Sequence, residues 1–172
     1  MTPPYNDLFF PTERNLPMEI RFAQNNDIPG MIALLYQVGG VHHDIRPDIF
    51  RAGAIKYTEK DLEAILSDEE KPIFVAVEED KVLGYCFCQI KDFRGSTVLT
   101  DRKEIYIDDL CVDETCRGRH IGKQLYEHTC AWAREIGCHF VTLNVWCGND
   151  SAMRFYESRG LTARSITMEY KL

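Results

Sequence analysis

Residues 104–126 read EIYIDDLCVDETCRGRHIGKQLY, and this stretch decides the fold. Its pattern predicts a strand up to Val112, a short polar turn, a basic glycine-containing loop over residues 117–122, and then a helix. The first N–H groups of a helix have no carbonyl partners within it, and the helix dipole is positive at that end. Together with the basic side chains, these donors predict an anion site suited to a diphosphate. The alternative is an ordinary strand, loop and helix with a solvated basic turn.

The composition is that of a single globular domain. The 172 residues are 45% hydrophobic and 27% charged, and a chain of this length buries a substantial core. The formal net charge of −7 argues against nucleic acid as the main partner, because phosphate backbones bind basic surfaces. An acidic surface instead suits a cationic substrate. We expect a loose N-terminal extension over residues 1–17 and one domain over residues 18–172.

The cysteines indicate a reducing compartment, and the lengths of the hydrophobic runs argue against a membrane span. The seven cysteines contain no C-x-x-C pair, and several lie inside apolar patterns, which is typical of reduced thiols in the cytoplasm. No apolar run approaches the roughly 18 residues that a membrane span needs. The first 17 residues lack the basic start of a signal peptide. Because no run is long enough to span a membrane, we expect no membrane partner. The histidines show no metal-binding spacing, so we expect no metal.

Hydrophobic periodicity predicts the element order β-α-α-β-β-β-α-β-α-β. A first helix follows Asp27 and ends at Gly39-Gly40, and the acidic turn Glu78–Lys81 joins an antiparallel hairpin. The segment Phe140–Trp146 is dense in strand-forming apolar residues, which is typical of a central strand covered on both faces. The alternation in Leu161–Tyr170 predicts a final strand.

The loop at residues 117–122 resembles the acetyl-CoA-binding motif of the GNAT family of N-acetyltransferases, Gln/Arg-x-x-Gly-x-Gly/Ala at the start of a helix. Arg117 fills the first position and Gly122 the last, whereas His120 stands where the family usually has its middle glycine. The family uses the backbone N–H of that position, so a side chain that points away is compatible. The resemblance implies an acetyl-CoA site made by the following residues: Arg117, Gly118, Arg119, His120, Ile121, Gly122 and Lys123.

The same resemblance implies the GNAT fold from about residue 18 to the C-terminus. This is an α/β fold in which a mixed central sheet, splayed near its middle, carries helices on both faces. In the family, the strand before the phosphate loop pairs through its main chain with the pantetheine arm of the cofactor. The matching residues here are Leu110, Cys111 and Val112. A backbone N–H in that region would stabilise the oxyanion of the reaction.

A second resemblance lies in the run from Asn149 to Tyr156, which is similar to the family's Asn-x-x-Ala-x-x-x-Tyr. It implies that Asn149 hydrogen-bonds the cofactor arm and that Tyr156 donates a proton to the departing CoA thiolate. The alternative is that Tyr156 is a core aromatic residue beside Phe155 on an amphipathic helix.

The acceptor amine arrives mostly protonated and needs a base. Strand alternation places Glu104, Tyr106 and Asp108 on one face and Asp109 on the other. Burial and mutual repulsion would raise the pKa of one of the two aspartates, which suits a base. The stretch 105–112 also resembles the strand of spermidine/spermine acetyltransferases, in which acidic residues face the polyamine. Asp108 and Asp109 are therefore candidate bases, and Glu104 and Tyr106 candidate substrate contacts. The alternative is that both acids sit at a bulge and reach solvent.

The segment Val41–Phe50 is expected to be a loop that lines the acceptor pocket, as in GNAT enzymes. His43 and Asp44 are its candidates for binding an amine or relaying its proton, and Phe50 or Tyr57 for covering it. The alternative is that these residues are simply solvated.

These features predict an acetyl-CoA-dependent N-acetyltransferase that works by direct attack in a ternary complex. The expected acceptor is a small cationic amine, and a peptide amine on a protein is the alternative. A non-catalytic acyl-CoA sensor also stays open. A nucleotide-binding α/β protein is disfavoured, because Gly122-Lys123 is followed by Gln124 where a P-loop needs Ser or Thr. Family resemblance implies a homodimer as one option for the assembly.

Overall fold

A computed structural model describes residues 17–172 of the chain, so the predicted extension over residues 1–17 lies almost entirely outside the described residues. Its elements are β1 (Glu19–Phe22), the 3-10 turn η1 (Asn25–Asp27), α1 (Ile28–Ile45), α2 (Glu59–Leu66), β2 (Ile73–Glu78), β3 (Lys81–Asp92), β4 (Lys103–Val112), the 3-10 turn η2 (Glu114–Cys116), α3 (Ile121–Glu135), β5 (Phe140–Leu143) and α4 (Asp150–Glu157). The predicted order is confirmed up to the last helix.

The five strands form one mixed sheet in the order β1-β2-β3-β4-β5. Strands β1 to β4 pair with one another in antiparallel order, and β5 runs parallel to β4 after the crossover through α3. The predicted acidic hairpin turn joins β2 to β3 through Glu79 and Asp80, with φ of 49° and 63°. Positive φ at both central residues matches the right-handed twist of the flanking strands.

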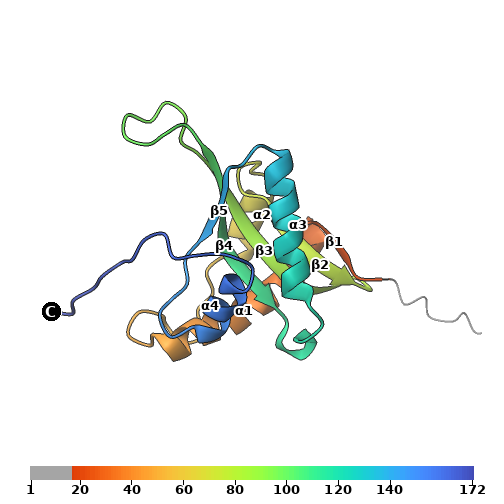
Figure 1. Cartoon of the computed structure of the whole chain (residues 1–172). Helices are drawn as coiled ribbons and strands as arrows, with labels where there is room; N and C mark the ends of the chain where they lie inside the picture. Colours follow the sequence, from red (N-terminus) through yellow and green to blue (C-terminus); the bar gives the residue numbers. More distant parts are fainter. Residues whose placement is uncertain (1–16) are drawn as a thin grey trace, which may run out of the picture.

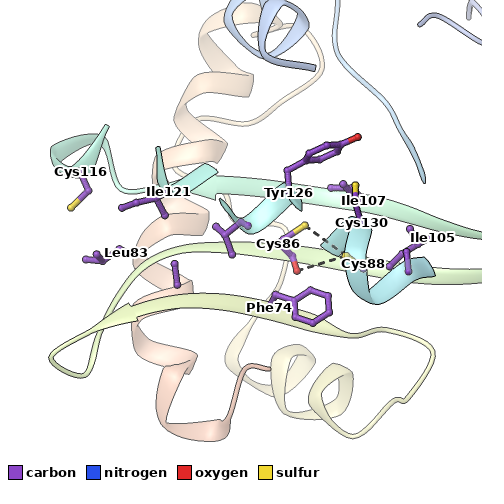
Figure 2. Close-up of a cluster of buried hydrophobic side chains, with 13 residues drawn as sticks. Phe74, Leu83, Cys86, Cys88, Ile105, Ile107, Cys116, Ile121, Tyr126 and Cys130 are labelled. Atoms are coloured by element: carbon purple, nitrogen blue, oxygen red, sulfur yellow. Dashed lines mark hydrogen bonds between the residues drawn. The ribbon is translucent and has the colours of Figure 1, made fainter. Parts of the chain in front are cut away.

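Helices cover both faces of this sheet (Figure 1). Helices α1 and α2 pack on one face around Leu34, Leu62 and Tyr85, in what we call the α1 layer. Helices α3 and α4 pack on the other face, the α3 layer, which Figure 2 shows around Phe74 and Tyr126. Strand β2 is buried on both faces, because its alternate residues enter alternate layers.

Helix α1 does not end at Gly39-Gly40 as predicted but continues to Ile45. A Cβ atom at Gly39 would lie 2.5 Å from the carbonyl oxygen of Ala54. The glycine therefore serves the close approach of the following loop to the helix rather than a helix end. As a result, His43 and Asp44 lie in the last turn of α1 and not in a loop.

The C-terminal part departs furthest from the sequence prediction. Strand β5 has four residues and lies at the edge of the sheet, with Phe140 53% exposed. The predicted final strand over Leu161–Tyr170 is not formed, and this segment runs away from the sheet (Figure 1). The prediction of a covered central strand is thus wrong for the single chain, because nothing in residues 17–172 pairs with the outer edge of β5.

Candidate active site

The sheet opens between β4 and β5. Pairing of these strands runs from Glu104 opposite Phe140 to Ile107 opposite Leu143 and then stops. Strand β4 continues to Val112, paired there with β3 alone. The β5-facing edge of residues 108–112 therefore has no strand partner within residues 17–172. This edge contains the predicted pantetheine-binding residues, and such an edge can pair with an extended chain of amides.

A β-bulge lies where this opening begins. Asp109 is opposite Phe87 and Ile107 is opposite Cys88, so Asp108 is the extra residue of β4. Consequently Ile107 and Leu110, three positions apart, both pack in the α3 layer. The prediction that Asp108 and Asp109 lie on opposite faces is wrong, because the bulge interrupts the alternation. Both carboxylates bind phenols of the α1 layer instead.

Asp108 is held by two side chains from the loop between α1 and α2. Its Oδ2 accepts hydrogen bonds from the Tyr57 hydroxyl and from Lys56 Nζ, each at 2.6 Å. The Asp108 side chain is 11% exposed, against 46% for Lys56. The bulge of the expected alternative is therefore present, but the Asp108 carboxylate is bound by side chains of the protein rather than free in solvent.

Asp109 accepts a 2.8 Å hydrogen bond from the hydroxyl of Tyr85. Burial, reinforced by the charge of Asp108, raises the pKa of Asp109 from 3.8 to about 6, although the Tyr85 hydrogen bond and the charge of Lys56 oppose the rise. Burial first, and the acids next, raise the pKa of Tyr85 and Tyr57, so both phenols stay protonated donors. The prediction that burial and repulsion raise the pKa of one acid of the pair fits Asp109, which changes ionisation close to neutral pH.

The predicted phosphate loop lies between η2 and α3. Gly118 has φ of 83°, and His120 is the N-cap of α3 with φ of 60° and ψ of 18°. His120 therefore has the left-handed conformation that a glycine adopts without strain. Its side chain and those of Arg117 and Arg119 are exposed. The loop thus has the backbone of a glycine-rich turn, although its middle residue is histidine.

The basic side chains of this loop differ in their availability. Arg119 donates two hydrogen bonds to Glu78, at 2.6 and 3.1 Å. Lys123 approaches Glu127 only to 3.8 Å. Ile121 is buried in the core and anchors the start of α3, so only its main chain is free to face a ligand.

Helix α4 carries Asn149 and Tyr156. The Asn149 Oδ1 accepts from the N–H of Ala152 at 3.2 Å and caps the helix, which accounts for this residue without a ligand. Tyr156 is half-buried against Phe155, with ring centroids 5.1 Å apart, and packs on the α3 layer. Burial first, and then nearby groups that include Asp109, raises the pKa of Tyr156. Tyr156 is thus a packed aromatic residue that also keeps its proton near the opening.

The cysteine at the opening is not an activated nucleophile. The Cys111 thiol is buried and lies 3.7 Å from the carbonyl oxygen of Leu34. Burial raises its pKa to about 12, so it remains a thiol at neutral pH. All seven cysteines of the chain lie in the described part and are free.

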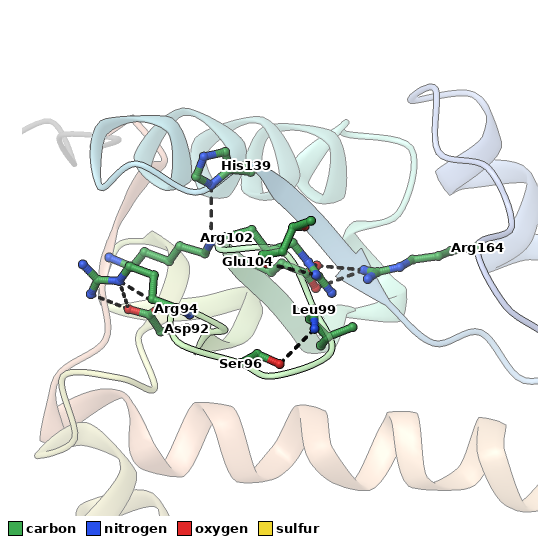
Figure 3. Close-up of polar contacts among 10 residues, drawn as sticks. Asp92, Arg94, Ser96, Leu99, Arg102, Glu104, His139 and Arg164 are labelled. Carbon is green, nitrogen blue, oxygen red and sulfur yellow. Dashed lines mark hydrogen bonds and ion pairs between the residues drawn. The ribbon is translucent and has the colours of Figure 1, made fainter.

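Two predicted substrate residues of β4 have other partners. Glu104 is 2% exposed and binds Arg102 at 2.5 Å and Arg164 at 3.0 Å, as Figure 3 shows. Tyr106 accepts a 3.1 Å hydrogen bond from the Asn144 amide, next to the opening. Burial first, and then the charge of Asp108, raises the pKa of Tyr106, whereas Glu104 is held by two arginines.

His43 and Asp44, the candidates of the predicted loop, lie in the last turn of α1 and have partners other than Asp108 and Asp109 or are exposed. The His43 Nδ1 lies 2.8 Å from the carbonyl oxygen of Phe50, and Asp44 is exposed. Lys56, which donates a hydrogen bond to Asp108, and Tyr85, which donates one to Asp109, were not predicted from the sequence. Neither has a spacing signal, because Tyr85 belongs to an apolar strand and Lys56 to an irregular loop.

Within residues 17–172, no group of three or more His, Cys, Asp or Glu side chains is arranged to hold a metal ion. Among the same residues, no helix combines the length and the hydrophobicity that crossing a membrane requires.

Comparison with known proteins decides the family. Residues 41–161 match the model of the acetyltransferase (GNAT) family. The chain belongs to this family. The GNAT match includes the bulge, the opening, the loop before α3 and Tyr156. GNAT enzymes transfer an acetyl group from acetyl-CoA, so the chain is an acetyl-transferring enzyme, and the sensor alternative is not supported.

Individual GNAT relatives agree with this assignment. The peptidyl-lysine N-acetyltransferase YjaB of Salmonella typhimurium is 29% identical over 153 residues, which cover 86% of this chain and 87% of YjaB. An uncharacterized N-acetyltransferase of Lactobacillus delbrueckii subsp. lactis is 32% identical over 84 residues, and the match spans about half of that relative (47%) and 49% of this chain. A mutant of the BH1408 protein from Bacillus halodurans has 32% identity and a TM-score of 0.85, over 90% of this chain and 99% of that protein.

Proposed function

We propose that the chain transfers the acetyl group of acetyl-CoA to a primary amine by direct attack in a ternary complex. The observation that supports this most is the bulge of β4, which puts two carboxylates where β4 separates from β5. An amine held by the acids would meet a thioester that lies along the free edge of residues 110–112. The loop before α3 would bind the diphosphate.

The proposed reaction needs two proton movements. Asp109 or Asp108, directly or through water, takes a proton from the acceptor ammonium, and the free amine attacks the thioester carbonyl carbon. A backbone N–H of the β4 edge stabilises the oxyanion. The C–S bond then breaks, and the Tyr156 hydroxyl donates its proton to the thiolate as it leaves. The second proton that the new amide nitrogen loses restores this hydroxyl, so the products are the amide and the CoA thiol. Asn149 holds the pantetheine arm in this scheme through the amide N–H₂ that helix capping leaves available.

The proposed acceptor is a small cationic amine. Asp108 already binds an alkylammonium group, that of Lys56, in the free chain. The net charge of −7 also favours a cation. A peptidyl lysine is the second candidate, because YjaB is named for that acceptor and the bound ammonium is a lysine's. Tyr106 and Tyr57 would flank either acceptor.

The test is thiol release from acetyl-CoA with polyamines, amino sugars, free lysine and lysine peptides as acceptors. We expect turnover with a primary alkylamine and none with its N-acetylated form. Tyr156→Phe should bind acetyl-CoA normally and lower kcat by about a hundredfold or more, since a general acid contributes roughly 10²-fold to 10⁴-fold. Unchanged kcat in this variant would remove Tyr156 from the mechanism.

We also propose that the enzyme is a cytoplasmic homodimer. The seven free thiols fit a reducing compartment. The C-terminal segment exposes one face of alternating apolar side chains, namely Ile166 (80%), Met168 (86%), Tyr170 (87%) and Leu172 (109%). A second copy offers the matching surface, since its β5 edge is equally unpaired. Pairing of each C-terminal segment with the β5 of the partner would cover both.

A further inference from the structure

Lys56 places a primary amine inside the proposed acceptor site. Its Nζ donates to Asp108 Oδ2 at 2.6 Å, lies 3.5 Å from the Asp108 carbonyl oxygen and is 5.4 Å from the centre of the Tyr57 ring. A carboxylate, a carbonyl oxygen and an aromatic ring are the groups that bind an alkylammonium. Lys56 thus occupies the position that the proposed function assigns to the acceptor.

The opening for the thioester begins at the same residue. Pairing between β4 and β5 ends at Ile107, and Asp108 is the next residue of the chain. The amine, its base and the start of the free β4 edge are therefore adjacent. Lys56 reaches this point from a loop, on a flexible four-carbon side chain that is 46% exposed. Because the amine belongs to the chain itself, its effective concentration at the base is high.

We propose that Lys56 is a self-acetylation site: when acetyl-CoA is bound and no acceptor is present, the chain acetylates its own Lys56. This inference rests on the proposed function, since it uses the same cofactor and the same pair of carboxylates, with Asp108 as the base here because it contacts the Lys56 ammonium directly. Asp108 takes one proton from the Lys56 ammonium, and the neutral Nζ attacks the acetyl carbonyl carbon. As the C–S bond breaks, Nζ loses its second proton and the CoA thiolate takes up one proton, so CoA leaves as the thiol and Lys56 becomes an uncharged amide.

The modification changes the site. Acetyl-Lys56 has no positive charge and cannot form the ion pair with Asp108. The carboxylate is then free for an external ammonium, so acetylation would convert an occupied acceptor site into an open one.

Lys71 provides a matched control within the same chain. It also pairs with an aspartate, Asp68, at 2.8 Å, and it is 47% exposed. Its partner lies outside β4, so a chemical reaction with free acetyl-CoA should modify Lys56 and Lys71 alike, whereas catalysis should select Lys56.

The experiment incubates the full chain with acetyl-CoA alone and follows acetylation of each lysine by peptide mass spectrometry. We expect Lys56 to be acetylated at least about tenfold faster than Lys71, with a rate constant that does not change with protein concentration. In Asp108→Asn the Lys56 rate should fall at least about tenfold, as expected for loss of a base. In Lys56→Arg, which keeps the charge, the intact protein should gain no acetyl group beyond the background measured at Lys71.

The outcomes separate this inference from the proposed function. Turnover on an external amine with equal, slow acetylation of Lys56 and Lys71 would overturn self-acetylation and leave the function standing. A Lys56 rate that rises in proportion to protein concentration would also overturn it, because the transfer would then be between chains. Failure to bind acetyl-CoA would overturn both.

Discussion

At the scale of residues, the site depends on how two adjacent aspartates differ. Asp108 binds a cation and a phenol, whereas Asp109 binds the Tyr85 hydroxyl and has its pKa raised to about 6, chiefly by burial. Two like charges next to each other repel, so a neutral Asp109 relieves the pair at low pH. The side chain that ionises near neutral pH is thus the better base, and Asp108 is the better ammonium ligand.

This assignment predicts opposite pH dependences for activity and stability. The value of kcat/KM should rise through an apparent pKa of about 6 as Asp109 becomes a base, and should be roughly tenfold below its plateau at pH 5. The pKa of Asp109 is higher in the folded chain than in the unfolded chain, so the protonated carboxyl stabilises the fold. This contribution is fully present below about pH 3.8 and is lost as the pH rises through about 6. The loss is on the order of 3 kcal/mol, at about 1.4 kcal/mol per pKa unit.

Asp109→Asn provides the check. Urea unfolding between pH 4 and pH 7 should show a smaller fall in the free energy of unfolding than in the wild type, and the acidic limb of kcat/KM should disappear along with most of the activity. An acidic limb near pH 6 that persists in Asp109→Asn would assign the base to another group.

His120 yields a second prediction at this scale. Its left-handed backbone costs a non-glycine residue on the order of 1–2 kcal/mol, whereas glycine loses more entropy on folding. His120→Gly should therefore leave the free energy of unfolding unchanged or raise it by up to about 1 kcal/mol, while β-branched His120→Val should lower it by about 1 kcal/mol or more. Urea unfolding measures both. A clear destabilisation by glycine would show that the imidazole itself stabilises the loop.

At the scale of elements, regular periodicity was sufficient for most of the fold. The hairpin of β2 and β3, the helix α3 and the loop before it follow from apolar spacing and turn residues. The end of α1 did not, because Gly39 looks like a helix terminator in sequence and is a packing residue in space. The bulge was predicted only as an alternative, because the presence of two acids deep in a strand suggests it, whereas the extra residue is identified only once the register with β3 is known.

At the same scale, the proposed pairing of the C-terminal segment with a second copy predicts the effect of substitutions in that segment. Because its apolar face is composed of Ile166, Met168, Tyr170 and Leu172, Ile166→Asp combined with Met168→Asp should convert the dimer to a monomer. The matched control, Ser165→Asp with Thr167→Asp, changes the other face and should keep more of the dimer. Light scattering after size-exclusion chromatography measures the mass. A monomeric wild type at micromolar concentration would refute the strand-exchange proposal.

At the scale of the whole molecule, the proposed mechanism brings the two substrates to one point of the sheet from different layers. The phosphate loop and Tyr156 belong to the α3 layer, whereas Tyr57, Tyr85 and the acids belong to the α1 layer. They converge where β4 leaves β5. This separation lets both substrates be bound together, and the protonated Cys111 offers no acyl-enzyme route.

The sequence contains local patterns for the proposed cofactor half of this site but not for the proposed acceptor half. The loop motif and the Asn149–Tyr156 run are local patterns with fixed spacing. The acceptor half depends on contacts between distant segments, such as Lys56 and Tyr57 with Asp108, 52 and 51 residues apart. No periodicity encodes such contacts, so Tyr57 was predicted only as a cover for the acceptor, and Lys56 and Tyr85 were not predicted.

Direct transfer in a ternary complex is tested by the initial rate of thiol release, measured while the concentrations of acetyl-CoA and of a primary amine are both varied. Direct transfer in a ternary complex predicts double-reciprocal lines that intersect, and no burst of thiol before the amine is added beyond the amount that acetylates Lys56. Parallel lines, with an acetyl group found on a cysteine, would show a covalent intermediate and contradict the account.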